Sequence, residues 1–220
     1  VPKTADGRVL FAVPWLGKVI LGTTDTPRHD LAREPTPFPD EVAFILNESA
    51  RYLRRPPLAA DVRSVWVGLR PLVKPQDENG DNTKSLSREH TVLASRSGLV
   101  TVTGGKWTTY RAMAEDVLQK CVASGLLDER KGGATNDLPL VGAPSGRAVH
   151  RMCDPQGWHS YGSDATFVRQ LSGSASELDM GLTEAMVRFA VRNEYARTVE
   201  DVLARRWRAL FLDARRSQGM

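Results

Sequence analysis

The sequence predicts an α+β fold, in which a mixed or antiparallel sheet packs with helices and a small all-α domain follows at the C-terminal end. Two pairs of β-branched and aromatic runs, each joined by a short turn that contains glycine, indicate antiparallel hairpins. Apolar residues at helical spacing follow each pair, and they dominate 182–216. The predicted domains are 1–128 and 138–220, joined by a charged, glycine-containing linker at 129–137.

The N-terminal part begins with a hairpin that joins 8–14 to 18–23. Several prolines within 26–39 then predict a loop, because proline removes a backbone donor. Asp40 offers an N-cap carboxylate to an amphipathic helix over 41–54. We therefore expect this helix to pack on the first strands.

A strand pattern over 62–72 ends near Pro71, and the wholly polar residues 74–84 predict a surface loop. The second hairpin joins 91–94 to 99–103. After it the chain turns on paired glycines and enters a helix that Gly125 ends. In the C-terminal region, Thr198 and Asp201 predict a capping box. One helical face carries the apolar residues Val199, Val202, Leu203, Trp207, Leu210 and Phe211.

Composition excludes several classes of protein. With 41% hydrophobic and 25% charged residues the chain is neither disordered nor fibrous, and no apolar run is long enough to span a bilayer. Cys121 and Cys153 cannot build a disulfide framework, so we expect a reducing, cytoplasmic location. The four histidines have neither metal-ligand spacing nor a nucleophile partner, so no metal site is expected.

The net charge of +4 suits anionic ligands or lipid surfaces but does not indicate nucleic acid. Acidic residues interrupt the arginines of the C-terminal region, and no aromatic stacking platform accompanies them. A solvated helix face is the favoured interpretation of these arginines. We expect no nucleic-acid partner.

The turn Gly104-Gly105-Lys106 stands where a strand passes into a helix and is suited to negative charge. Glycines let a ligand approach the backbone, the first N–H groups of a helix lack intrahelical acceptors, and Lys106 adds a full charge. The spacing is not that of a nucleotide P-loop. A Gly-Gly turn between a strand and a helix is also common for steric reasons alone.

Arg70 and Arg88 form the second candidate. Arg70 ends one predicted strand and Arg88 precedes the next, so two guanidinium groups lie at similar heights on one sheet. Paired guanidinium forks suit a phosphate dianion, although for each arginine taken by itself a solvated strand-end charge is the favoured interpretation. Thr24 lies in a run of hydroxyls and a carboxylate that suits either a ligand or the closure of a turn.

Taken together, these segments resemble the FAD-dependent glycerol-3-phosphate dehydrogenases. The resemblance covers nearly the whole chain and is most diagnostic in Gly-Gly-Lys-Trp-Thr-Thr-Tyr-Arg at 104–111. Its motifs follow in order at 11–15, 21–25, 68–72, 87–90, 104–111, 138–143 and 198–208.

The resemblance implies a flavoenzyme with a Rossmann-type FAD domain, a substrate domain of the D-amino-acid-oxidase type and a helical C-terminal cap. It implies oxidation of sn-glycerol 3-phosphate to dihydroxyacetone phosphate, with electrons passed through FAD to a membrane quinone. By the same resemblance, Arg70 and Arg88 clamp the substrate phosphate and Thr24 lies near the substrate. The residues that approach the flavin are Gly104, Gly105, Lys106, Trp107 and Thr108.

One feature of the family has no counterpart in this sequence. No G-x-G-x-x-G fingerprint is present, and the chain begins Val1-Pro2 without an initiator methionine. We therefore expect a C-terminal portion of the enzyme, inactive alone, whose partner is the N-terminal FAD domain. The catalytic base is expected upstream of Val1, and none is assigned here.

Two alternatives stay open. A glycerophosphate oxidase would return the electrons to oxygen, and a non-catalytic module would dock a partner or anionic lipid through the helical tail. Peripheral association with the inner face of the cytoplasmic membrane and a homodimer are also left open by the sequence.

Overall fold

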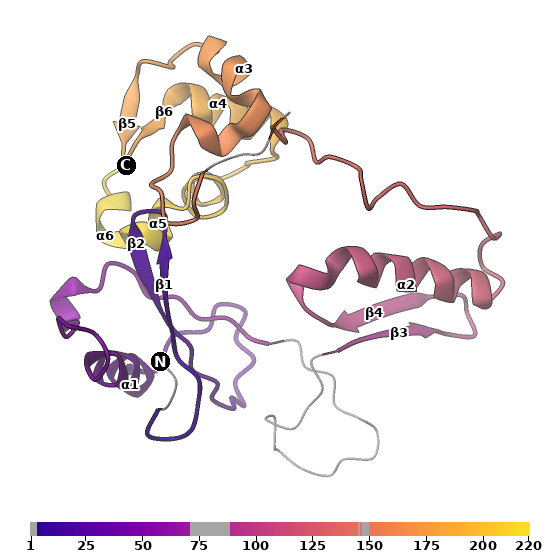
Figure 1. Cartoon of the computed structure of the whole chain (residues 1–220), viewed down its shortest axis with the longest axis horizontal. Helices are drawn as coiled ribbons and strands as arrows, with labels where there is room; N and C mark the ends of the chain where they lie inside the picture. Colours follow the sequence, from indigo (N-terminus) through magenta and orange to yellow (C-terminus); the bar gives the residue numbers. More distant parts are fainter. Residues whose placement is uncertain (1–3, 71–88, 145, 147–149) are drawn as a thin grey trace. The chain divides into compact units, whose positions relative to one another are not determined.

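The computed structural model of the chain (Figure 1) describes residues 4–70, 89–144, 146 and 150–220. The chain forms two compact units that interleave along the sequence. Unit 1 comprises 1–26, 34–67 and 140–220, and unit 2 comprises 27–33 and 68–139. Short antiparallel hairpins and helices occur in both units, so the expected α+β class is confirmed at this level.

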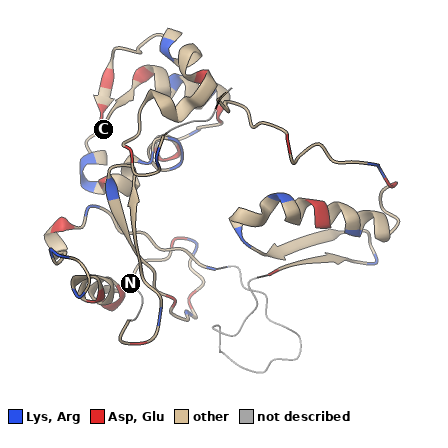
Figure 2. Cartoon of the chain, viewed as in Figure 1, with Lys and Arg blue, Asp and Glu red and all other residues tan. Residues whose placement is uncertain are grey.

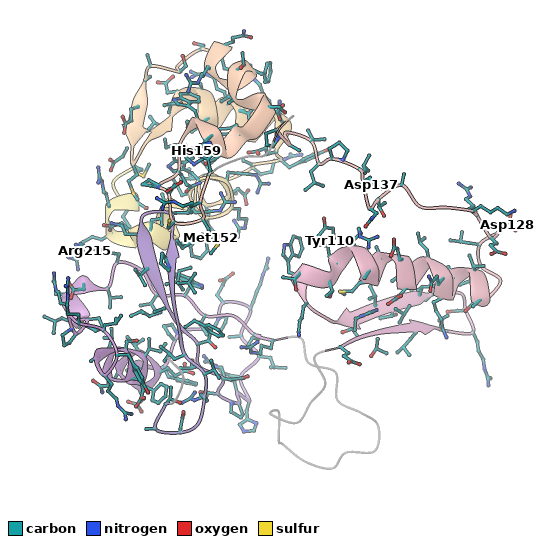
Figure 3. The ribbon with its side chains drawn as sticks, in the orientation of Figure 1. Tyr110, Asp128, Asp137, Met152, His159 and Arg215 are labelled. Atoms are coloured by element: carbon teal, nitrogen blue, oxygen red, sulfur yellow. The ribbon has the colours of Figure 1, made fainter. Side chains whose placement is uncertain are left out.

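Unit 1 begins with the predicted hairpin, formed by β1 (Phe11–Trp15) and β2 (Lys18–Gly22). Its two-residue turn has positive φ at both positions, 47° at Leu16 and 79° at Gly17, which matches the right-handed twist of the strands. The turn packs on the C-terminal part of the unit. The Leu16 N–H donates to the Met152 carbonyl at 2.9 Å, and Met152 is labelled beside the tip of the hairpin in Figure 3.

Helix α1 (Pro39–Ala50) differs from the prediction at both ends. It begins two residues earlier than expected, because Pro39 suits the first helical position, where its missing N–H has no intrahelical acceptor. Phe38 is therefore the N-cap and Asp40 lies inside the first turn, so the assignment of Asp40 as the cap was wrong. The helix ends at Ala50 rather than at residue 54, and a short 3₁₀ turn, η1 (Ala59–Asp61), follows the loop after it.

The predicted strand over 62–72 is not formed in its described part, 62–70. These residues are extended, but their hydrogen bonds go to the C-terminal helical region instead of a neighbouring strand. The Arg63 carbonyl accepts from the Ala214 N–H at 3.1 Å, and the Ser64 hydroxyl donates to the Leu210 carbonyl. The loop expected at 74–84 lies outside the described residues.

The C-terminal part of unit 1 consists of short elements around one core. They are the 3₁₀ segment η3 (Trp158–Asp164), α3 (Ala165–Gln170), β5 (Glu177–Asp179), β6 (Leu182–Thr183), α4 (Glu184–Asn193), the π-helix η4 (Asp201–Arg206), α5 (Ala209–Leu212) and α6 (Ala214–Ser217). The β5–β6 pair corrects the expectation of an all-α domain.

The core of this part is apolar and includes the predicted residues Val202, Leu203 and Trp207. Val199, expected on the same face, is 72% exposed although residues 199–200 are already helical, so this residue lies outside the apolar face. The predicted capping box is present. The Asp201 N–H donates to the Thr198 hydroxyl at 3.1 Å, and the Thr198 N–H donates to the Asp201 carboxylate at 3.0 Å.

Unit 2 contains the second predicted hairpin and the helix that follows it. Strands β3 (His90–Ala94) and β4 (Val100–Gly104) pair antiparallel, and the 3₁₀ turn η2 (Trp107–Thr109) leads into α2 (Tyr110–Ala123). Residues 127–139 then run as an extended segment with little regular structure, in which Figure 3 labels Asp128 and Asp137.

The strands of the described residues form three separate two-stranded antiparallel sheets. The expectation of one larger sheet is therefore not met in this part of the chain, because each hairpin pairs only with itself. None of the helices described is both long and apolar enough to cross a bilayer.

Candidate functional site

The turn between β4 and α2 requires glycine at both of its first positions. Gly104 and Gly105 have φ values of 76° and 81°, a region that other residues rarely adopt. A Cβ on Gly104 would lie 2.6 Å from the Glu89 carbonyl oxygen. A Cβ on Gly105 would lie 2.6 Å from the Met113 side chain and 3.0 Å from the His90 Cβ. The two glycines therefore bring this turn against β3 and α2 as closely as the backbone allows.

Lys106 and Trp107 stand where the turn enters the helix. Lys106 is exposed and extended, with φ −126° and ψ 143°, and precedes the 3₁₀ turn. Trp107 is 86% exposed and stacks on Tyr110, the first residue of α2, with ring centroids 5.6 Å apart and planes 26° apart. Figure 3 labels Tyr110 at this end of the helix. A cation, a helix start and an open aromatic surface thus share one edge of unit 2.

Two side-chain contacts involve α2. His90 Nε2 and the Asp116 carboxylate are 2.7 Å apart, which ties the first residue of β3 to the middle of the helix. The Arg111 guanidinium donates to Glu115 one turn further along α2. The first pair spans the strand and helix on either side of the glycine turn, so it helps to fix where the turn lies.

Arg70 and Arg88 were expected as neighbours on one sheet, and the structure does not show that arrangement. Arg70 is exposed, belongs to unit 2 and does not end a strand, since 62–70 forms none. Arg88 lies outside the described residues. The pairing of the two arginines therefore stays a prediction.

Thr24 lies just after β2 in unit 1 and is half-buried. Its hydroxyl and that of Thr26 both hydrogen-bond to the Glu41 carboxylate, the latter at 2.7 Å. Partial burial opposes ionisation of Glu41, but these hydrogen bonds and the Phe38 N–H outweigh it and lower its pKa. An ionised Glu41 therefore holds Thr24 in place.

The structure brings together some of the predicted residues. Gly104, Gly105, Lys106, Trp107 and Thr108 form one continuous turn, and Arg70 belongs to the same compact unit. Thr24 belongs to the other unit.

The sequence analysis did not identify two features that hold site residues in place, the Glu41 carboxylate and the contact between His90 and Asp116. Glu41 carried a signal, because it stands two residues after Pro39, and a proline followed by acidic residues is typical of the first turn of a helix. The pairing of His90 with Asp116 carried none, because 26 residues separate them and only the packing of α2 on β3 brings them together.

Two family models match the chain in succession. The model described as FAD dependent oxidoreductase matches residues 1–111, and the model described as C-terminal domain of alpha-glycerophosphate oxidase matches 133–220. The segment between the two matches includes most of α2 and the start of the extended run that follows it.

Curated relatives extend the similarity over almost the whole chain. The mitochondrial glycerol-3-phosphate dehydrogenase SDP6 of Arabidopsis thaliana is 38% identical over 97% of this chain. The mitochondrial glycerol-3-phosphate dehydrogenases of Schizosaccharomyces pombe and Rattus norvegicus are 35% and 36% identical over 98% and 99% of it. The chain spans 38%, 41% and 32% of the lengths of these three proteins. From the first family model, which covers half of the chain, the chain belongs to the FAD-dependent oxidoreductase family, and over almost its whole length it is similar to glycerol-3-phosphate dehydrogenases.

Proposed function

We propose that the protein to which these residues belong oxidises sn-glycerol 3-phosphate to dihydroxyacetone phosphate and passes the two electrons to a quinone. The observation that carries the proposal is the 35–38% identity to named glycerol-3-phosphate dehydrogenases over 97–99% of the chain. The reaction removes a hydride equivalent from the secondary carbon and a proton from its hydroxyl. When bound, FAD supplies the two-electron acceptor for that step.

The residues of the glycine turn fit a planar anionic group. The glycines leave no side chain over the turn, Lys106 supplies a positive charge, and the start of the helix adds the positive end of its dipole. Gly104, Gly105, Lys106, Trp107 and Thr108 would face the flavin and stabilise negative charge there. No catalytic base is assigned among the residues of this chain.

The substrate residues are proposed from the resemblance. Arg70 and Arg88 would bind the phosphate dianion through bidentate hydrogen bonds, and Thr24 would lie near the glycerol part, oriented by Glu41. The remaining length of the relatives would supply the dinucleotide-binding half of the flavin site. Residues 129–137 would link the substrate and cap domains.

The test is an anaerobic titration of the whole protein with its flavin. Adding sn-glycerol 3-phosphate should bleach the oxidised flavin absorbance in proportion to the sites present, because two electrons enter each flavin. Glycerol and inorganic phosphate, which each lack half of the substrate, are the controls. A flavin that stays oxidised with millimolar substrate would contradict the proposal.

Oxygen is the second candidate acceptor, because the C-terminal model carries the name of an oxidase. Substrate-dependent formation of hydrogen peroxide at a rate near that of quinone reduction would favour the oxidase. A location at the inner face of the cytoplasmic membrane and a homodimer are further parts of the proposal. Activity that sediments with membranes and is released by salt would support the first, and the mass in solution would test the second.

A further inference from the structure

A cavity of about 590 Å³ opens in the C-terminal part of unit 1, and the residues that line it all lie within 141–208. Its volume is in the range of sites that hold small molecules. Among the described residues, none of those proposed for substrate or flavin lines it. A role for this cavity therefore has to be argued independently of the proposed function.

One wall of the cavity is aromatic. Tyr161 and Phe167 each contact Phe189 edge to face, with ring centroids 5.5 and 6.0 Å apart. Trp207, also on the lining, is 2% exposed, and its indole N–H donates to the Met180 carbonyl at 3.0 Å. Because Trp207 is anchored in the core, the residues on either side of it have fixed positions.

Arg208 is the unusual cation of this cavity. Acidic and basic residues are interspersed along the C-terminal part (Figure 2), and Arg205 is paired with Glu200 and Asp201 at 2.6 and 2.8 Å. Arg208 is half-buried and has no carboxylate within ion-pair distance among the residues that the structure describes. Its Nη1 donates only to the Arg206 carbonyl, at 3.0 Å.

The backbone of Arg208 is strained as well. Its φ of 61° and ψ of 17° are left-handed, a conformation that costs a non-glycine residue free energy. An asparagine would adopt it more readily than an arginine. Arg208 thus lines this cavity with a backbone conformation that is unfavourable for arginine.

Acceptors also line the cavity. The Asp164 carboxylate makes no hydrogen bond within the described ranges, and Glu194 lies close enough to be influenced by Asp164, Arg206 and Arg208. Burial raises the pKa of Glu194, which the two arginines only partly offset. The cavity thus presents a guanidinium that can take an anion and a carboxylate that can accept from a hydroxyl.

We propose that this cavity binds a small hydroxylated anion, a polyol phosphate or a hydroxy acid. The anionic group pairs with Arg208, a hydroxyl donates to Asp164, and the carbon skeleton lies on the aromatic wall. An anion without a carbon-bound hydroxyl forgoes the hydrogen bond to Asp164, and a neutral polyol forgoes the ion pair with Arg208. Both halves of the ligand are therefore needed for tight binding.

The proposal is tested by calorimetric titration of the 220-residue chain with sn-glycerol 3-phosphate, D-glycerate, inorganic phosphate and glycerol. At least one of the first two should bind saturably and tenfold or more tighter than phosphate or glycerol. The tighter of these two ligands shows whether the cavity prefers a phosphate or a carboxylate as the anionic group. No saturable binding of either hydroxylated anion would overturn the proposal.

Variants locate the binding. Arg208→Asn removes the cation while keeping a residue that accepts left-handed backbone, and should weaken binding at least tenfold. Arg215→Asn, at an exposed arginine of α6 labelled in Figure 3, is the matched control and should leave the affinity unchanged. Asp164→Ala removes the acceptor, so it should lower the preference for hydroxylated anions over inorganic phosphate, and it serves also if Arg208→Asn fails to fold.

A last variant separates this site from the proposed substrate site. Arg70→Gln should leave binding in the cavity intact. Loss of binding in Arg70→Gln with full binding in Arg208→Asn would overturn the cavity proposal and support the proposed substrate site instead. Loss in Arg208→Asn alone would support the cavity while leaving the proposed function to its own test.

Discussion

Gly104 is required for two independent reasons, its backbone conformation and the space around it. Gly132 shares only the first. Their φ values are 76° and 72°, but a Cβ on Gly104 would meet the Glu89 carbonyl oxygen at 2.6 Å, whereas one on Gly132 would meet nothing within 4 Å. The carbonyl belongs to the backbone and cannot rotate away as a side chain can. Comparing substitutions at Gly104 and Gly132 therefore separates the free-energy cost of the steric clash from that of the positive φ.

We expect Gly104→Ala to destabilise unit 2 by about 2–4 kcal/mol, and Gly132→Ala by about 1 kcal/mol or less. Hydrogen exchange of the α2 amides measures the free energy of opening this unit. Equal effects of the two substitutions would show that the turn can relax away from β3.

Arg70 carries the sharpest prediction about the substrate. In the whole protein, Arg70→Ala should raise the KM for sn-glycerol 3-phosphate by about 10- to 100-fold, because it removes a charge-assisted pair with the phosphate. Flavin content should be unchanged. Arg96→Ala, at an exposed arginine in the β3–β4 turn, is the control. Equal loss of flavin and substrate would show that Arg70 is structural.

Single residues with local roles were predictable from the sequence, and residues with distant partners were not. The glycines of the turn and the Thr198–Asp201 capping box depend on neighbours a few residues away, and the structure contains both features. The contact of His90 with Asp116 depends on how a helix packs, which no local pattern records.

The same distinction holds for whole elements. Both hairpins were predicted because a tight turn sets their register, whereas the strand expected at 62–72 needed a partner strand. Residues 62–67 are extended as their composition favours, yet Trp66 packs edge to face on Phe211 at 5.0 Å. Here packing against a distant helix decided the structure over β propensity.

Glu194 follows α4 directly and gives a pH-dependent prediction. Burial raises the pKa of its carboxyl above the usual 4.5, so the ionised form is disfavoured in the folded state. The folded protein then holds this proton more tightly than the unfolded one, and stability declines as pH rises through the folded pKa.

Glu194→Gln should therefore raise the melting temperature at pH 7 by about 1–2 °C, a figure reduced for solvent screening. The gain should vanish below the usual pKa of 4.5, where both forms are neutral. Thermal unfolding between pH 4 and pH 8 measures this. Glu200→Gln, which removes an exposed ion pair with Arg205, should give no gain at any pH. A gain that is independent of pH would contradict the mechanism.

At the scale of the molecule, unit 1 is assembled from segments far apart in the sequence. The β1–β2 turn donates to the carbonyls of Met152 and Cys153, and the Arg63 carbonyl accepts from the Ala214 N–H. The predicted division at 129–137 follows composition, which cannot reveal that N-terminal segments pack against the C-terminal part. The division at 129–137 stays a prediction. It implies two domains that separate when the chain is cut in the linker, whereas interleaved units imply fragments that stay associated.

Cleavage at a protease site inserted between Lys131 and Gly132 distinguishes interleaved units from two linear domains. If unit 1 is held together as the hydrogen bonds indicate, fragments 1–131 and 132–220 should co-elute in gel filtration and separate only in denaturant. Gly17→Ala should weaken their association, since a Cβ there would lie 3.2 Å from Pro155. Gly7→Ala has the same φ of 79° with nothing within 4 Å and is the matched control. Fragments that separate without denaturant would favour two independent domains in linear order. The contacts that the hairpin and residues 62–67 make with the C-terminal part would then be too weak to hold unit 1 together.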